Sequence, residues 1–191
     1  DVTDDAACAR LVEQALARFG RLTTLVNSAG VRPVAADPAP PPAEWRRVVE
    51  VNLTGTYLPS RAALGALRAS GAASITNLAS IYGLVGGSMA PSYAASKGGV
   101  ANLTRQLALN WAPTVRVNCV CPGVIETPMT RFPRSTRSWT SSGFRHRRGE
   151  PAKVSVPAAR AIASWLARAT DRIVGLQTNE RRRAESRMMA E

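Results

Sequence analysis

The sequence of 191 residues contains few of the residues that build metal centres, disulfide frameworks or histidine-dependent triads. It has one histidine and three cysteines, too few for the usual four-ligand zinc sites or for a disulfide framework. A serine–histidine–acid triad would need His146, which lies in a charged stretch of low apolar content. We expect Cys119 and Cys121 to be reduced strand and loop residues rather than metal ligands.

Long hydrophobic runs and aromatic residues are also scarce. No run reaches 18 apolar residues, so no membrane-spanning helix and no membrane partner are predicted. With no visible leader sequence, the expected location is the cytosol, that is, cytoplasmic. The hydrophobic fraction of 45% suits a single domain over 1–191. Because the sequence opens Asp1-Val2-Thr3 without a methionine, we expect it to be part of a longer protein.

Positive charge is abundant but unevenly distributed. Residues 131–191 hold 14 of the 25 basic residues and 5 of the 13 acidic ones. Basic surfaces attract phosphate, so a nucleic-acid-interacting protein acting through 131–191 is one hypothesis. Aromatic residues, only 5% of the chain, do not interleave with this segment, and no recognition-helix pattern appears. We therefore favour a solvated, poorly ordered basic tail and expect no nucleic-acid partner.

Lysine is rarer still, because only Lys97 and Lys153 are lysines among the 25 basic residues. Arginine does not readily lose its proton, whereas lysine is a compact charge with three rotatable donors. The choice of lysine at position 97 therefore suggests a site that uses this chemistry.

Apolar periodicity predicts helices and strands in alternation. The helices are expected at 3–19, 43–69, 92–112 and 157–169, and the strands at 22–27, 73–79 and 115–120. This order predicts an α/β fold with a parallel sheet and helices on its faces. We expect Thr3 to cap the first helix, Gly20 to end it, and Trp45 to lie on the apolar side of the second.

Ligands of parallel α/β sheets bind beyond the carboxyl ends of the strands, where the loops here begin at Asn27, Ser80 and Cys121. Tyr93 and Lys97 follow Ser80 at i, i+4 spacing and so share a helix face. An ammonium beside a phenol favours the phenolate and lowers its pKa from about 10. Taken singly, each residue is more often a cap, a turn or a surface pair. Together they predict a proton-transfer site for an alcohol and its ketone.

Five motifs over 1–130 resemble those of the short-chain dehydrogenase/reductase family, in the same order and at similar spacing. They are Asp1-Val2, Asn27-Ser28-Ala29-Gly30 (the family has asparagine at the second position), Asn52 within 51–55, Ser80 with the Tyr-Ala-Ala-Ser-Lys-Gly-Gly of 93–99, and the Pro-Gly-Val-Ile-Glu-Thr of 122–127.

The resemblance implies a role for each matched residue and an NAD or NADP cofactor, with the choice between the two left open. Tyr93 is implied as acid/base, Lys97 as the group that lowers its pKa and holds the nicotinamide ribose, Ser80 as the residue that orients the substrate oxygen, and Asn52 as the anchor of a water. The implied cofactor-binding residues are Asp1, Val2, Asn27, Ala29, Gly30, Tyr93, Lys97, Pro122, Gly123, Ile125 and Thr127.

The resemblance also implies a partial Rossmann-type, doubly wound parallel sheet with helices on both faces, lacking the first strands and the glycine-rich turn. The implied activity is NAD(P)-dependent oxidation of alcohols or reduction of ketones. A homo-oligomer, dimer or tetramer, is implied through the helices at 43–69 and 92–112, where Gly98 and Gly99 would permit close packing. Residues 131–191 diverge from the family pattern. The alternative is an inactive, truncated remnant or non-catalytic scaffold that binds no cofactor.

Overall fold

The structure is a computed structural model that describes residues 1–34, 37–87 and 89–123. All of these residues belong to one compact unit, Asp1–Gly143. The segment 131–191, with the helix expected near 157–169, lies outside the described residues. The prediction of one domain over 1–191 therefore stays a prediction.

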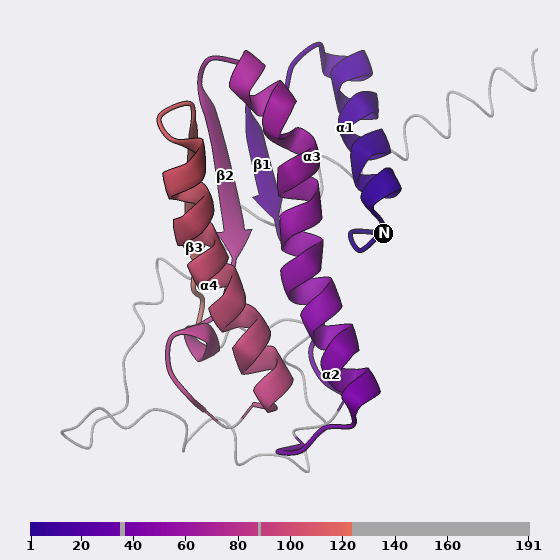
Figure 1. Ribbon diagram of the computed structural model, residues 1–191, viewed down its shortest axis with the longest axis vertical. Helices are drawn as coiled ribbons and strands as arrows, with labels where there is room; N and C mark the ends of the chain where they lie inside the picture. Colours follow the sequence, from indigo (N-terminus) through magenta and orange to yellow (C-terminus); the bar gives the residue numbers. More distant parts are fainter. Residues whose placement is uncertain (35–36, 88, 124–191) are drawn as a thin grey trace, which may run out of the picture. The chain divides into compact units, whose positions relative to one another are not determined.

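Three parallel strands form the sheet: β1 (Thr24–Asn27), β2 (Ala73–Leu78) and β3 (Val115–Val120). Their order is β1-β2-β3, so β2 is hydrogen-bonded on both sides (Figure 1). Leu25 pairs with Ile75, which pairs in turn with Val117. The predicted parallel α/β arrangement is thus confirmed, and β3 has the predicted bounds.

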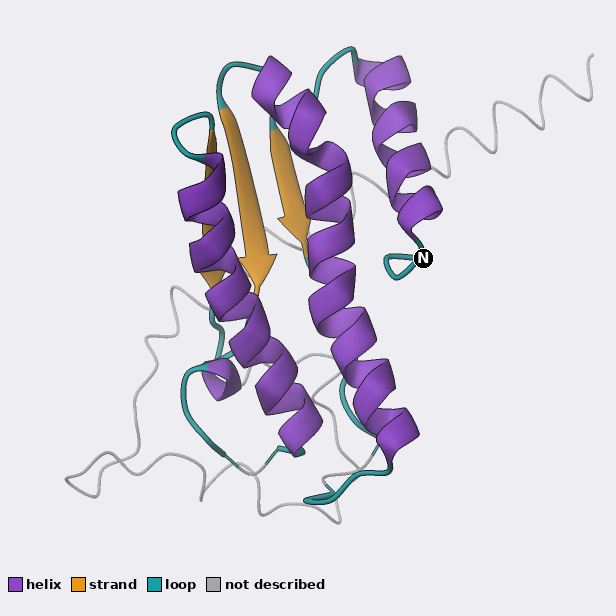
Figure 2. Ribbon diagram, in the orientation of Figure 1, coloured by secondary structure: helices purple, strands orange, loops and turns teal. Residues whose placement is uncertain are grey.

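The long helices lie on one face of this sheet (Figure 2). They are α1 (Asp5–Phe19), α2 (Pro42–Val49), α3 (Gly55–Ala69) and α4 (Pro91–Trp111). In the figure α3 and α4 lie in front of the sheet and run along its strands, and α1 lies beside α3. A helical layer on the opposite face is not among the described residues, so that part of the expected doubly wound fold stays a prediction.

The first helix begins and ends at residues that satisfy its free backbone groups. Asp4, not Thr3, is the N-cap, and its carboxylate accepts a hydrogen bond of 3.1 Å from the Ala7 N–H. Thr3 instead donates through both its N–H and its hydroxyl to the Asp1 carboxylate. Gly20 ends the helix in the left-handed region at φ 74°, as expected.

The predicted helix 43–69 is divided by a π-helical turn, η1 (Glu50–Thr54), between α2 and α3. The Gly55 N–H donates to the Glu50 carbonyl oxygen, five residues back, which widens the helix by one residue. Trp45, expected on the apolar side of this helix, is 40% exposed, whereas Val48 is fully buried.

The main core lies between the sheet and α3–α4. Buried apolar side chains from both helices and from β2 and β3 form it: Ala63, Leu67, Ala73, Ile75, Leu107, Trp111, Val115 and Val117. Gly98 and Gly99 contribute to packing inside the chain, because a Cβ at Gly99 would lie 2.8 Å from Leu53 Cδ2. Among the described residues, no helix is long and apolar enough to cross a membrane.

Candidate active site

The carboxyl ends of β2 and β3 bring two predicted site segments together. Pairing continues past both strands, since the Ala79 N–H donates to the Val120 carbonyl at 2.9 Å. One step further, the Ile81 N–H donates to the Pro122 carbonyl at the same distance. Ser80 is therefore held between two hydrogen bonds that tie its loop to the loop after β3.

Ser80 is 6% exposed and begins the short 3₁₀ turn η2 (Ile81–Gly83). Its hydroxyl oxygen accepts a hydrogen bond of 3.2 Å from the Tyr82 N–H. The turn packs closely on α4, because a Cβ at Gly83 would lie 2.5 Å from the Lys97 carbonyl carbon. Only glycine allows this approach, which places the Ser80 loop against the part of α4 that carries Lys97.

Lys97 is 6% exposed, although its side chain carries an ammonium. Its Nζ donates a hydrogen bond of 2.6 Å to the Leu78 carbonyl oxygen at the end of β2. Burial lowers the pKa of Lys97 from 10.5 to about 8. The same Nζ lies 5.9 Å from the centroid of the Tyr93 ring, so the pair predicted from spacing does share one face of α4.

Tyr93 is half-buried, and its pKa is raised above the ordinary value of 10.0. Burial is the main cause, and the neighbouring Ser80 hydroxyl acts in the opposite direction. The predicted lowering by Lys97 is therefore contradicted in this structure. The Lys97 ammonium is directed to the Leu78 carbonyl, and removal of the phenol from water dominates.

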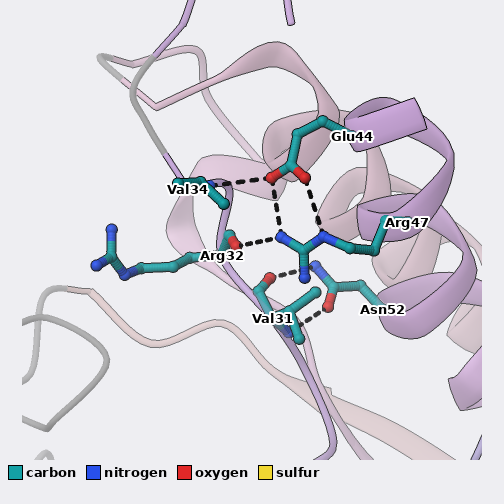
Figure 3. A network of polar contacts seen from close by, with 6 residues as sticks. All are labelled: Val31, Arg32, Val34, Glu44, Arg47 and Asn52. Atoms are coloured by element: carbon teal, nitrogen blue, oxygen red, sulfur yellow. Dashed lines mark hydrogen bonds and ion pairs between the residues drawn. The ribbon is translucent and has the colours of Figure 1, made fainter. Parts of the chain in front are cut away.

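Asn52 is fully buried in η1 and holds the loop after β1 through its carboxamide. Oδ1 accepts from the Val31 N–H at 2.7 Å, and Nδ2 donates to the Val31 carbonyl at 3.0 Å (Figure 3). Nδ2 also donates to Ser96 Oγ at 3.0 Å, and Ser96 donates to the Tyr93 carbonyl at 2.8 Å. Both amide hydrogens of Asn52 are thereby used to position backbone and α4.

An ion pair on α2 secures the same loop next to Asn52. The Glu44 carboxylate accepts from the Val34 N–H at 3.0 Å and from Arg47, and Arg47 donates to the Arg32 carbonyl at 3.0 Å (Figure 3). The hydrogen bond with Arg47 and that with Val34 lower the pKa of Glu44 from 4.5 to about 2. The segment from Val31 to Val34 is thus fixed at three successive points.

Asn27, at the end of β1, belongs to a buried ladder of polar side chains. Its Nδ2 donates to Ser60 Oγ and to Asn77 Oδ1, each at 2.8 Å. Asn77 donates to Thr104 Oγ1 at 2.9 Å, and Thr104 donates back to the Val100 carbonyl of α4. This ladder links β1 and β2 to α3 and α4. Asn27 therefore stabilises the scaffold beneath the site.

Gly30 lies next to two of the catalytic candidates, Asn52 and Lys97. A Cβ there would lie 3.3 Å from Asn52 Oδ1 and 3.7 Å from Lys97 Nζ. Because Gly30 has no side chain, space remains beside its backbone, and a ligand can approach Asn52 Oδ1 and Lys97 Nζ there.

The adenine-side candidates Asp1 and Val2 lie at the start of the described chain. Val2 packs against η1, because a Cβ at Gly55 would lie 2.7 Å from Val2 Cγ2. Both residues border a hollow of about 330 Å³, whose other lining residues are Ala7, Cys8, Arg10, Leu11, Gln14 and Pro59.

The structure thus gathers Ser80, Tyr93, Lys97, Asn52 and Gly30 around the ends of the strands. Pro122 and Gly123 follow β3 beside Ser80, and Ala29 is exposed. Ile125 and Thr127 lie outside the described residues. Over 1–34, 37–87 and 89–123, no three metal-ligating side chains cluster.

Sequence reasoning missed Ser96, which joins Asn52 to the Tyr93 carbonyl. Its position three residues after Tyr93 on the same helix was the available signal. Sequence reasoning also missed the position of Cys121 close to both Lys97 and the Ser80 backbone, where these groups affect one another's pKa.

A parallel sheet with Ser80, Tyr93, Lys97 and Asn52 at its carboxyl end defines the class of short-chain α/β oxidoreductases. The sequence matches the short chain dehydrogenase family over residues 1–138. The chain belongs to this family.

Relatives of known name support this assignment. The chain is 44% identical over 135 residues to cis-4-hydroxycyclohexanecarboxylate dehydrogenase of Sinomonas cyclohexanicum, covering 68% of this chain and 53% of the relative. It is 38% identical to a 3-alpha-(or 20-beta)-hydroxysteroid dehydrogenase of Mycobacterium tuberculosis, covering 81% and 59%. It is 40% identical to L-fucose dehydrogenase of Mus musculus, covering 83% and 61%. The chain therefore spans little more than half the length of these relatives.

Solved structures give the same result for the fold. Ligand-free aldohexose dehydrogenase of Thermoplasma acidophilum is 34% identical, with a TM-score of 0.64 over 68% of this chain and 51% of that one. ElxO with bound NADP is 30% identical, with a TM-score of 0.63 over 67% and 52%.

Proposed function

We propose that the protein is an NAD(P)-dependent dehydrogenase/reductase that interconverts a secondary alcohol and its ketone, with Tyr93 as acid/base. The observation that carries the proposal is the joint burial of Ser80, Tyr93 and Lys97 at one end of the parallel strands. The influence of the Ser80 hydroxyl on the pKa of Tyr93 indicates that the two groups lie close together, which supports a shared contact with one substrate oxygen.

The residues around Lys97 fit a nicotinamide cofactor. Gly30 leaves room above Lys97 Nζ and Asn52, where a side chain would otherwise lie. Lys97 would donate to the ribose hydroxyls, and Pro122, Gly123, Ile125 and Thr127 would hold the nicotinamide end. A bound nicotinamide would supply the hydride for ketone reduction and accept it in alcohol oxidation. A structural relative with bound NADP supports NAD or NADP without deciding between them.

In this proposal Tyr93 gives its proton to the ketone oxygen during reduction and takes it back during oxidation. Ser80 donates to the same oxygen and fixes its direction. The raised pKa of Tyr93 keeps the phenol protonated, which suits the reducing direction near neutral pH. Oxidation requires the phenolate, which the charge of Lys97 would favour once its ammonium turns toward the phenol oxygen.

The names of the relatives support a ring-borne secondary alcohol as substrate. Their names refer to hydroxycyclohexanecarboxylate, cyclopentanol, L-fucose and 3-alpha-(or 20-beta)-hydroxysteroid. In all of these except the 20-beta-hydroxysteroid, the hydroxyl is carried by a ring. We propose a cyclic alcohol or ketone for this protein as well. A homo-oligomer formed through α3 and α4 is part of the same proposal.

The test compares Tyr93→Phe with Tyr57→Phe in the protein expressed from its own gene. Tyr57, 39% exposed on α3, is the matched control. With cyclohexanol or cyclohexanone and either cofactor, Tyr93→Phe should lower turnover at least about 100-fold. Cofactor affinity, measured by nicotinamide fluorescence, should stay unchanged, and Tyr57→Phe should behave like the wild type. Equal turnover in both variants would refute the acid/base role.

The second candidate is a scaffold that retains the four catalytic-type residues but binds no cofactor. The fluorescence titration distinguishes the two, because the scaffold would give no enhancement with NADH or NADPH at millimolar concentration.

A further inference from the structure

A pair of cysteines that the proposed reaction does not use lies beside the candidate catalytic lysine. Cys119 Sγ and Cys121 Sγ are 3.9 Å apart, on the last strand and directly after it. Cys119 lies in β3 and Cys121 is two positions further on, directly after the strand, so the extended backbone brings both side chains out on the same face. Both pack against the small buried cluster of Ala79, Val100 and Ala101.

Cys121 contacts two parts of the candidate site. The Cys121 sulfur lies close enough to the Ser80 backbone N–H for that group to lower the pKa of the thiol, and a Cys121 thiolate would raise the pKa of Lys97. Burial raises the pKa of the Cys121 thiol, with Cys119 contributing in the same direction. The environment of Lys97 therefore depends on the chemical state of this sulfur.

We propose that Cys119 and Cys121 are a redox modification site that a hydroperoxide converts to an intrachain disulfide beside Ser80 and Lys97. One thiolate attacks a peroxide oxygen, the O–O bond breaks, and a sulfenic acid and one water form. The second thiol attacks the sulfenic sulfur, an S–S bond forms, and a second water leaves. Two thiols are oxidised, one hydrogen peroxide is reduced, and both thiol protons end in water.

The geometry favours closure and easy reopening. The sulfurs must approach from 3.9 Å to the bond length of about 2.05 Å. Small rotations of the two side chains shorten this distance, but the extended backbone limits how far the sulfurs can approach. A disulfide with this restriction is strained and so is more readily reduced than a structural one. Closure also draws the Cys121 sulfur away from the Ser80 N–H.

The third cysteine provides an internal control. Cys8 is 2% exposed on α1, and its thiol donates to the Val2 carbonyl at 3.6 Å. Cys119 and Cys121 are half-buried, so a molecule as small as hydrogen peroxide reaches them more easily than it reaches Cys8.

The test treats the folded 191-residue chain with hydrogen peroxide, blocks free thiols and digests with trypsin. Cleavage after Arg10, Arg116 and Arg131 puts Cys8 in peptide 1–10 and the other two cysteines in peptide 117–131. Peptide 117–131 should lose about 2 Da and regain it with dithiothreitol. Cys8 should stay a blocked thiol, and Cys8→Ser should close at the wild-type rate.

Two comparisons make the result decisive. Cys119→Ser should show no 2 Da loss and should instead trap Cys121 as sulfenic acid. Closure should be faster in the folded chain than in guanidinium, because the fold holds the sulfurs 3.9 Å apart. Equal rates in both solvents, oxidation of Cys8 as fast as the pair, or chain-to-chain disulfides in place of the internal one would overturn the proposal.

Discussion

The Lys97 ammonium donates a hydrogen bond of 2.6 Å to the main-chain carbonyl of Leu78, the last residue of β2. This contact ties the residue expected to act in catalysis to the strand end that carries Ser80. It also fixes the position of the ammonium when no ligand is bound. The lysine is thus a structural link between α4 and β2 as well as a chemical group.

Lys97 should titrate near pH 8, since burial holds its pKa at about 8 instead of 10.5. The unfolded chain then binds the additional proton between these two values, so the free energy of unfolding should rise as pH increases from about 8 to about 10.5. The chain has only two lysines, so a ¹⁵N-lysine spectrum of Lys153→Arg isolates the signal of Lys97. A Lys97 midpoint above pH 10 would contradict the buried position.

Gly83→Ala should disturb the site, because the added Cβ would lie 2.5 Å from the backbone of α4 at Lys97. Overpacking of this kind costs about 1–3 kcal/mol of unfolding free energy. Gly86→Ala is the matched control, since a Cβ there meets nothing within 4 Å. Urea unfolding measures both variants, and equal midpoints would show that the η2 turn does not press on α4.

Thr104→Val should destabilise the chain by about 1–3 kcal/mol, because it leaves the buried Asn77 amide without its acceptor. The volume hardly changes, so the loss reports on the hydrogen bond. Thr24→Val, at an exposed position of β1, should change the stability by less than about 0.5 kcal/mol. If the two variants unfold alike, the ladder through Asn27 contributes nothing to stability.

Glu44→Gln should loosen the loop from Val31 to Val34 in a pH-dependent manner. The folded pKa of Glu44, about 2, lies below the ordinary 4.5, so its contribution is complete above about pH 4.5 and disappears as pH falls through about 2. The difference in unfolding midpoint between wild type and variant should shrink over that range. Glu13→Gln, at an exposed position of α1, should show no such trend.

Ser96→Ala should weaken the proposed enzyme without removing a reacting group. Ser96 is fully buried and links Asn52 to the Tyr93 carbonyl, so its loss frees both. We expect a lower kcat with a shifted pH profile, while Ser96→Thr restores part of the activity through its hydroxyl. A fall in stability with an unchanged profile would indicate a purely structural residue.

Much of this arrangement follows from the sequence, because strand alternation and helical spacing are local signals. The alternation of Val115 and Val117 with polar residues predicted β3 at its observed bounds. The i, i+4 spacing of Tyr93 and Lys97 correctly placed both on one helix face.

Other features depend on contacts between distant segments, which no local pattern encodes. The pKa of Tyr93 depends on its burial and on Ser80, 13 positions earlier in the chain, so spacing alone gave the wrong direction. Trp45 matches the helical apolar period, but it is 40% exposed in the part of the chain that the structure describes. Asp4 caps the first helix in place of Thr3, because Thr3 is hydrogen-bonded to the Asp1 carboxylate. The role of Ser96 needs η1 and α4 side by side.

The π-helical turn at Glu50–Thr54 makes this part of the chain sensitive to length. Asn52 reaches Val31 and Ser96 only because the turn contains one residue more than an α-helical turn would. Deleting a single residue between Glu50 and Thr54 would restore an uninterrupted helix, yet it would rotate Asn52 by about 100° relative to α3. A deletion that improves the regularity of the helix would thus separate Asn52 from the loop after β1 and from α4, which it joins.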